Sequence, residues 1–339
     1  MSDPLDNVTG QEGTKSAVIA PIETANLLDG IIGQKHIKRA VRPTIEAVNR
    51  GDRYVMRPML MCGAPGLGKT TIAEAICNSI FGGKKHDPID CTTTQGDELF
   101  LKLLNANAMD KFFLEDLPAL PPKDQERLMK FFDVACQRKP KEGGKVNEAK
   151  VKIDDKEYDI PQLSFIAATT APESVLKALR DRMDEYWLRD YSDGEADQMG
   201  LLMIHEAGLT ADLCAVRSFV AASFNHPRTM RKLAEQLADY PGDPPGNFTE
   251  ELVREFLADK DIDADGLVHK HHKFLQALFA LRQSKVSLER VANMADLPLK
   301  EVKIFETMLW KRGLVTPTGQ GPVLTKEGIQ RVIQRWSKK

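Results

Sequence analysis

Short apolar runs alternate with amphipathic segments through the first half of the chain. The runs lie at residues 59–62, 112–114 and 163–168, and each is too short to form a helix of average length. Before the first run, apolar residues recur at helical spacing, at Ile37, Ala40, Val41, Ile45 and Val48. Strands that alternate with helices predict an α/β fold with a parallel, doubly wound sheet, which binds ligands at the carboxyl ends of its strands.

From residue 190 onwards the pattern is almost entirely helical. It predicts a small helical lid that is interrupted only by the Pro- and Gly-rich segment 241–246. After residue 266 it predicts helices through 274–281, 286–292 and 300–311, a turn at 296–298, and short strands at 313–315 and 323–324. This order is typical of a DNA-binding winged helix, and a winged helix that docks on protein is the alternative.

These patterns predict four segments. We expect a mobile tail over residues 1–22, the α/β domain over 23–189, the lid over 190–265 and the winged helix over 266–339.

The last of these segments differs from the rest in its charge. The chain of 339 residues has a net charge of −2, whereas residues 266–339 contain 14 Lys and Arg against 5 Asp and Glu. This local positive charge favours a domain that faces an anion such as DNA.

The cysteines and the lack of long apolar runs indicate a cytoplasmic protein. The cysteines have neither paired zinc-ligand spacing nor a C-x-x-C motif, so we expect buried thiols in a reducing compartment. They are Cys62, Cys77, Cys91, Cys136 and Cys214. No apolar run approaches the length of a membrane span, and no signal-peptide pattern begins the chain.

The most specific motif is the Gly-rich segment 63–70, with the sequence GAPGLGKT. It matches G-x-x-x-x-G-K-[ST] and lies between a predicted strand and a predicted helix, as the motif requires. The backbone N–H groups of such a loop approach phosphates closely, and the next helix presents its positive end to them. Lys69 would reach the β- and γ-phosphates of ATP, and the Thr70 hydroxyl would hold Mg²⁺. A chance Gly-rich turn is the alternative, and ordinary glycine usage makes it rare.

Polar residues follow the next two predicted strands. Glu115 and Asp116 end the second strand, where a P-loop ATPase places its metal-holding and water-orienting acids. Thr170 follows the third strand, where a polar residue can contact the γ-phosphate or the attacking water. Arg228 begins the third lid helix and could fold back over a nucleotide. The alternatives are surface carboxylates at the end of an ordinary strand and an exposed arginine at a helix N-terminus.

Residues 137–160 are rich in Lys and Gly and contain the alternating sequence Val151-Lys152-Ile153. This pattern predicts a β-hairpin inserted before the third strand. Two interpretations stay open, a hairpin that grips a partner and a solvated surface loop.

Taken in order, these segments resemble the RuvB-like AAA+ ATPases, the motor family of Holliday junction branch migration. The resemblance covers roughly residues 24–335 and rests on the sequences GAPGLGKTT, IAATT followed by ALRDRM, NHPR, and Asp263-Ala264-Asp265-Gly266. It implies that Thr170 is sensor 1, that Arg182 is an arginine finger reaching a neighbouring subunit, and that Arg228 is sensor 2. It also implies a hexameric ring on duplex or branched DNA, coupled to the junction-binding protein RuvA.

The resemblance extends the set of predicted site residues. Thr70 and Glu115 would hold the metal, while Glu115, Asp116, Thr170 and Arg182 would serve catalysis. The predicted nucleotide contacts are Ile32, Gly63, Ala64, Pro65, Gly66, Leu67, Gly68, Lys69, Thr70, Thr71 and Arg228.

Three features depart from the family pattern. The family has Asp-Glu where this chain has Glu115-Asp116, an exchange that predicts slow hydrolysis. The family hairpin has an apolar tip that docks on RuvA, but here the region is basic, which weakens the expectation of a RuvA-like partner. Its basic residues are Arg138, Lys139, Lys141, Lys145, Lys150 and Lys152.

The third departure lies in the wing. The family wing carries two arginines, where this chain has Thr318 and Gln320. The predicted DNA contacts are therefore the nearby Lys311, Arg312 and Lys326.

The leading functional hypothesis is an ATP-driven motor that translocates on or remodels DNA. A loader-like switch, in which ATP binding changes affinity and hydrolysis resets it, stays open. So does a DNA-binding scaffold that hydrolyses little ATP.

Overall fold

The computed structural model describes residues 28–136, 149–153, 156–240, 247–282, 286–319 and 321–336. Its contacts form two compact units, one of residues 1–63 and 69–188 and the other of residues 64–68 and 189–339. The predicted lid and winged helix thus fall in one unit. The predicted tail, Gln320 and the basic residues 138–145 lie outside the described residues, as does the break at 241–246.

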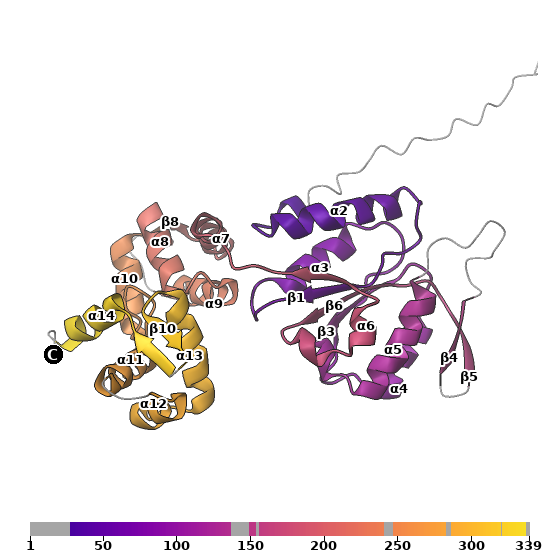
Figure 1. Ribbon diagram of the computed structural model, residues 1–339. Coiled ribbons are helices and arrows are strands. Elements are labelled where there is room, and N and C mark those ends of the chain that lie inside the picture. Colours follow the sequence, from indigo (N-terminus) through magenta and orange to yellow (C-terminus); the bar gives the residue numbers. More distant parts are fainter. Residues whose placement is uncertain are drawn as a thin grey trace, which may run out of the picture. The chain divides into compact units, whose positions relative to one another are not determined.

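A five-stranded parallel sheet, in the order β2-β3-β6-β1-β7, forms the centre of the first unit. β1 and β6 are buried along their whole length, as expected for strands covered on both faces. The strands are β1 (Met59–Cys62), β2 (Ile89–Asp90), β3 (Lys111–Glu115), β6 (Ser164–Thr169) and β7 (Asp184–Trp187). The predicted parallel sheet with flanking helices is confirmed (Figure 1).

Helices flank this sheet. Ile37, Val41, Ile45 and Val48 form the buried stripe of α2, which confirms the predicted amphipathic helix. Aromatic rings from α5, β3 and β6 share one hydrophobic core. The helices are α2 (Lys35–Asn49), α3 (Lys69–Asn78), α4 (Gly96–Leu104), η1 (Leu117–Ala119), α5 (Pro122–Ala135), η2 (Pro172–Ser174) and α6 (Lys177–Arg180).

The predicted hairpin is present. β4 (Ala149–Ile153) pairs antiparallel with β5 (Lys156–Ile160), so that Val151 lies opposite Tyr158. Lys150, one of its basic residues, lies 4.0 Å from the carboxylate of Glu157 on the other strand.

The second unit begins with the four lid helices α7 (Asp193–Glu206), α8 (Leu213–Ala222), α9 (Pro227–Ala238) and α10 (Glu250–Asp259). Polar side chains fix the starts of three of them. Ser192 and Glu195 form a capping box on α7, and Asp212 and Thr249 cap α8 and α10. β8 (Thr210–Ala211) and β9 (Asn247–Phe248) form a short parallel pair.

The winged helix follows in the same unit. Ser287 caps α12, and Asp296 ends it in a left-handed conformation with φ of 53°, at the predicted turn. The elements are α11 (His269–Leu281), α12 (Leu288–Ala295), α13 (Leu299–Lys311), β10 (Val315–Thr318), β11 (Gly321–Leu324) and α14 (Lys326–Trp336). The sequence prediction lacked α14.

Two further observations concern surface and burial. Cys62, Cys77 and Cys91 are buried as predicted, but Cys136 is half-buried and Cys214 is exposed, so the prediction was wrong for Cys214. Cys214 is the second residue of α8, next to the exposed Leu213, on the face that α8 turns away from its core. Within the described ranges, every helix is too short or too polar to span a bilayer.

Candidate nucleotide site

The Gly-rich loop connects the end of β1 to the start of α3. Gly66 and Gly68 have φ of 77° and 88°, which side chains with a Cβ rarely adopt, so glycine is required here. Lys69 is the first residue of α3, and its Nζ donates a hydrogen bond of 2.9 Å to the carbonyl oxygen of Gly63. Burial lowers the pKa of Lys69, while the negative charge of Asp116 raises it. The ammonium group thus lies inside the loop where phosphates bind in P-loop proteins.

Glu115 and Thr70 meet at the carboxyl edge of the sheet. Glu115 is the last residue of β3, and Thr70 is the second residue of α3. The Thr70 hydroxyl donates a hydrogen bond of 2.8 Å to Oε1 of Glu115. The structure therefore brings together the two residues that the sequence assigns to the metal.

Thr70 and Glu115 are suited to Mg²⁺ that is held partly by phosphates, and not to a metal whose ligands all come from the protein. Mg²⁺ prefers oxygen ligands and is usually held by one or two carboxylates together with substrate phosphates. The described residues contain no group of three or more His, Cys, Asp or Glu that could hold a metal. A hydroxyl and a carboxylate beside a phosphate-binding loop match the first pattern.

Asp116 is the N-cap residue of the short helix η1 and has a φ of 55°. Asp tolerates this left-handed conformation better than most residues. The residue is exposed, and its charge acts on Lys69. Glu115 and Asp116 thus have different surroundings, since Glu115 is the one hydrogen bonded to Thr70.

Thr170 follows β6, which lies between β3 and β1 in the sheet. The preceding residue, Thr169, pairs with Cys62 of β1 and is buried. Its Oγ1 accepts a hydrogen bond of 2.9 Å from the backbone N–H of Ala171. Thr170 itself is exposed at the same edge of the sheet as Glu115.

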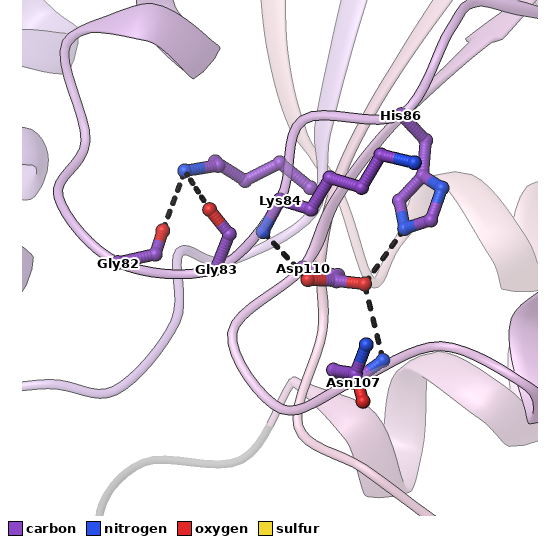
Figure 2. A network of polar contacts seen from close by, with 7 residues as sticks. Gly82, Gly83, Lys84, His86, Asn107 and Asp110 are labelled. Carbon is purple, nitrogen blue, oxygen red and sulfur yellow. Dashed lines mark hydrogen bonds and ion pairs between the residues drawn. The ribbon is translucent and has the colours of Figure 1, made fainter.

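A polar network ties the far ends of α3 and β3 together (Figure 2). Lys111, at the start of β3, is 4% exposed, and its Nζ donates to the carbonyl oxygens of Ile80, Gly82 and Gly83 at 3.1, 2.6 and 3.3 Å. These carbonyls lie just beyond the C-terminus of α3, where a cation is favourable.

The neighbouring Asp110 completes this network. Its carboxylate accepts hydrogen bonds from the backbone N–H of Lys84 at 2.6 Å and Asn107 at 3.1 Å, and contacts Nε2 of His86 at 2.7 Å. The loop after α3 is therefore fixed to β3 at one end, while Thr70 and Glu115 meet at the other. Sequence reasoning missed this pair, because a Lys at the start of a strand is an ordinary surface pattern.

Comparisons with known proteins agree with this geometry. Residues 24–187 match the family model of the Holliday junction DNA helicase RuvB P-loop domain. Residues 24–187 are therefore a RuvB-like AAA+ ATPase domain. The chain is 26% identical over 278 residues to a Holliday junction branch migration complex subunit RuvB of Myxococcus xanthus, which covers 80% of this chain and 78% of that protein.

Solved structures extend the likeness in fold beyond the RuvB P-loop domain. The Thermotoga maritima RuvB Holliday junction branch migration motor aligns with a TM-score of 0.71 at 19% identity, over 90% of this chain and 96% of that one. A point mutant of T. maritima RuvB aligns with a TM-score of 0.73 at 19% identity, over 90% of this chain and 97% of that one.

Arg182, the arginine finger implied by the family, lies just after α6 and is bound within its own subunit. Its Nε and Nη2 donate to the two carboxylate oxygens of Asp133 at 2.6 and 2.9 Å, and Nη1 donates to the carbonyl oxygen of Ala178 at 2.8 Å. The hydrogen bonds to Asp133 raise the pKa of Arg182. Asp133, on α5, is a partner that the sequence did not suggest, because it lies 49 residues away.

The remaining predicted nucleotide contacts have diverse surroundings. Ile32 is half-buried in the first unit. Arg228 is the exposed second residue of α9 in the second unit. Their approach to a nucleotide stays a prediction.

Two of the three predicted DNA contacts are bound within the second unit. Lys311 Nζ lies 2.6 Å from Oδ2 of Asp190. Arg312 donates to the carbonyl oxygen of Ala221 at 2.6 Å. Lys326, at the start of α14, is exposed.

Proposed function

We propose that this protein is an ATP-dependent DNA motor that acts as a ring on duplex or branched DNA, with Holliday junction branch migration as its specific activity. The observation that carries the proposal is the hydrogen bond between Thr70 and Glu115 beside the Gly-rich loop. It supports a phosphate and Mg²⁺ site at this edge of the sheet. The names of the RuvB relatives support the DNA-directed activity.

Each residue then has a separate task. Lys69 neutralises charge on the β- and γ-phosphates, and Thr70 and Glu115 hold Mg²⁺, which neutralises the charge that develops during phosphoryl transfer. Asp116 and Thr170 orient the attacking water. Because Asp116 has a shorter side chain than the family's Glu, hydrolysis is slower than it would be with optimal positioning.

Two arginines complete the site. Arg182 reaches the ATP of a neighbouring subunit, so the ring is required for turnover, as for arginine fingers supplied in trans. Arg228 contacts the nucleotide of its own subunit and reports its state to the lid.

The winged helix contacts DNA, because positive charge concentrates after residue 266. A hexamer encloses the duplex, and the hairpin β4–β5 docks a junction-binding protein like RuvA or, through its basic residues, contacts an acidic partner. We place the protein in the cytoplasm with its DNA substrate.

ATP turnover with and without DNA tests the proposal. Duplex or four-way DNA should raise the turnover number at least about tenfold, and ATP should shift the mass in solution to that of a ring. Turnover that DNA does not change would contradict a motor, and a single round of turnover on partner binding would indicate a loader. Lys69→Ala provides the background rate.

A further inference from the structure

The turn between α8 and α9 is strained. Phe224 and Asn225 have φ of 58° and 54°, two consecutive left-handed residues that are not glycine. Asn tolerates this conformation, whereas a bulky residue such as Phe rarely adopts it. Strained backbone persists only where the surrounding structure holds it, and it often marks a functional segment. This turn leads directly to Arg228, four residues after Phe224.

Arg312, from the end of α13, holds this turn. Its Nη2 donates to the carbonyl oxygen of Ala221 at 2.6 Å, and its guanidinium lies over the Phe224 ring at 4.4 Å from the centroid. Burial lowers the pKa of Arg312, and the carboxylates of Asp193 and Asp263 raise it. The side chain is thus a half-buried cation with defined partners.

Other contacts converge on the same turn. The rings of Phe224 and His271, which lies on α11, pack in a T-shaped arrangement with centroids 5.6 Å apart, and Asn225 donates to Oδ1 of Asp193 at 2.9 Å. A Cβ at Gly266, with φ of 80°, would lie 2.8 Å from the carbonyl oxygen of Ala222. The winged helix therefore packs on the α8–α9 turn through both Arg312 and the segment that connects it to the lid.

We propose that Arg312 is a positioning residue that couples the winged helix to nucleotide binding, by holding the turn that places Arg228. The inference rests on the proposed function for the role of Arg228. In this role Arg312 is not one of the DNA contacts that the sequence analysis predicts. DNA bound to the winged helix then changes nucleotide affinity through the Phe224–Asn225 turn, and nucleotide changes DNA affinity by the same factor.

The test measures that coupling without hydrolysis. The dissociation constant of a fluorescent non-hydrolysable ATP analogue is measured with and without saturating duplex DNA, and the ratio is the coupling factor. In the wild type this factor should be at least about 5, the lower end of typical coupling between sites. In Arg312→Ala it should fall to near 1, and Arg312→Lys, which keeps a donor and a cation, should restore part of it.

Arg282→Ala is the matched control. Arg282 also lies over a phenylalanine ring, 3.9 Å from the centroid of Phe279, and donates to the carbonyl oxygen of Phe279 at 2.6 Å. The ring and the carbonyl oxygen both belong to Phe279 of α11, so Arg282 does not connect the winged helix to the α8–α9 turn. Its removal should therefore leave the coupling factor unchanged. Phe224→Leu, which removes the ring under Arg312, should lower the factor as well, and replaces Arg312→Ala if that variant does not fold.

The salt dependence of DNA affinity separates coupling from direct contact. A lost phosphate contact lowers the slope of log affinity against log salt by about one unit, and Arg312→Ala should retain the wild-type slope. A lower slope with unchanged coupling would overturn the inference, as would a wild-type coupling factor of 1. Coupling without ATP turnover would refute the proposed motor and leave the inference standing.

Discussion

Replacing Asp133 tests whether Arg182 must leave its own subunit to act. Two hydrogen bonds of 2.6 and 2.9 Å join their side chains, which are 48% and 34% exposed. Exposed ion pairs contribute about 0.2–1 kcal/mol, and a two-point geometry favours the upper value. If Arg182 has to break this ion pair to reach a neighbouring ATP, breaking it adds about 1 kcal/mol to the activation free energy of turnover.

Asp133→Asn keeps the shape of the side chain and removes its charge. The variant should therefore raise kcat by up to about fivefold at saturating ATP and DNA, the rate equivalent of about 1 kcal/mol. KM for ATP should not change, because the pair is not a nucleotide contact. Steady-state kinetics on rings of confirmed mass measure both constants.

Glu98→Gln is the matched control, because Glu98 forms an exposed pair with Lys102 on α4 of the same unit, 2.9 Å apart. It should leave kcat unchanged. A kcat for Asp133→Asn at or below the wild-type value would mean that the ion pair holds Arg182 in its working position and does not have to break.

Three further predictions follow from the site and from burial. Glu115→Asp combined with Asp116→Glu should raise kcat, because the longer arm would then orient the water; an equal or lower kcat would show that the site has adapted to its own order. Lys69→Ala should abolish turnover while circular dichroism stays native, and mixing it with Arg182→Ala subunits should restore some activity if Arg182 acts in trans; no activity in confirmed mixed rings would argue against a shared site. Burial lowers the pKa of His271 to about 4, so between pH 6.5 and 4 the unfolded chain binds a proton that the folded protein does not. The free energy of unfolding should therefore decrease as the pH is lowered through this range, by at most about 3 kcal/mol. Urea titrations at pH 7 and 5 should show this loss in the wild type and a smaller one in His271→Leu.

Local patterns were sufficient to predict three strands of the sheet, the hairpin and the winged helix, but they missed the sheet strands β2 and β7. The apolar run of β1 followed by a Gly-rich loop specifies a strand, a turn and a helix within about twenty residues, and alternation predicts β4. The helix α14 was missed because its buried stripe is short, with Val332 at 3% exposure but Ile333 at 47%. Such a helix depends on tertiary packing more than on its own pattern.

Within the site, what the sequence could predict was set by the distance between partners along the chain. Thr70 and Glu115 were assigned because each belongs to a motif at the end of a strand or the start of a helix. Arg182 pairs with Asp133, 49 positions away, and Arg312 donates a hydrogen bond to Ala221, 91 positions away. Neither contact leaves a signal in the local sequence. A basic residue in a positively charged domain was therefore interpreted as a DNA contact, although it donates to a carbonyl inside the protein.

A synthetic four-way junction with fluorescent arms shows whether this protein is an ATP-driven motor on branched DNA. Separation of the arms into duplexes is followed in real time with ATP, with a non-hydrolysable analogue, and with Lys69→Ala. If the protein is such a motor, separation of the arms should require ATP hydrolysis and should be lost in Lys69→Ala. Hydrolysis of ATP with no movement of the junction, or movement at the same rate with the analogue, would contradict this activity.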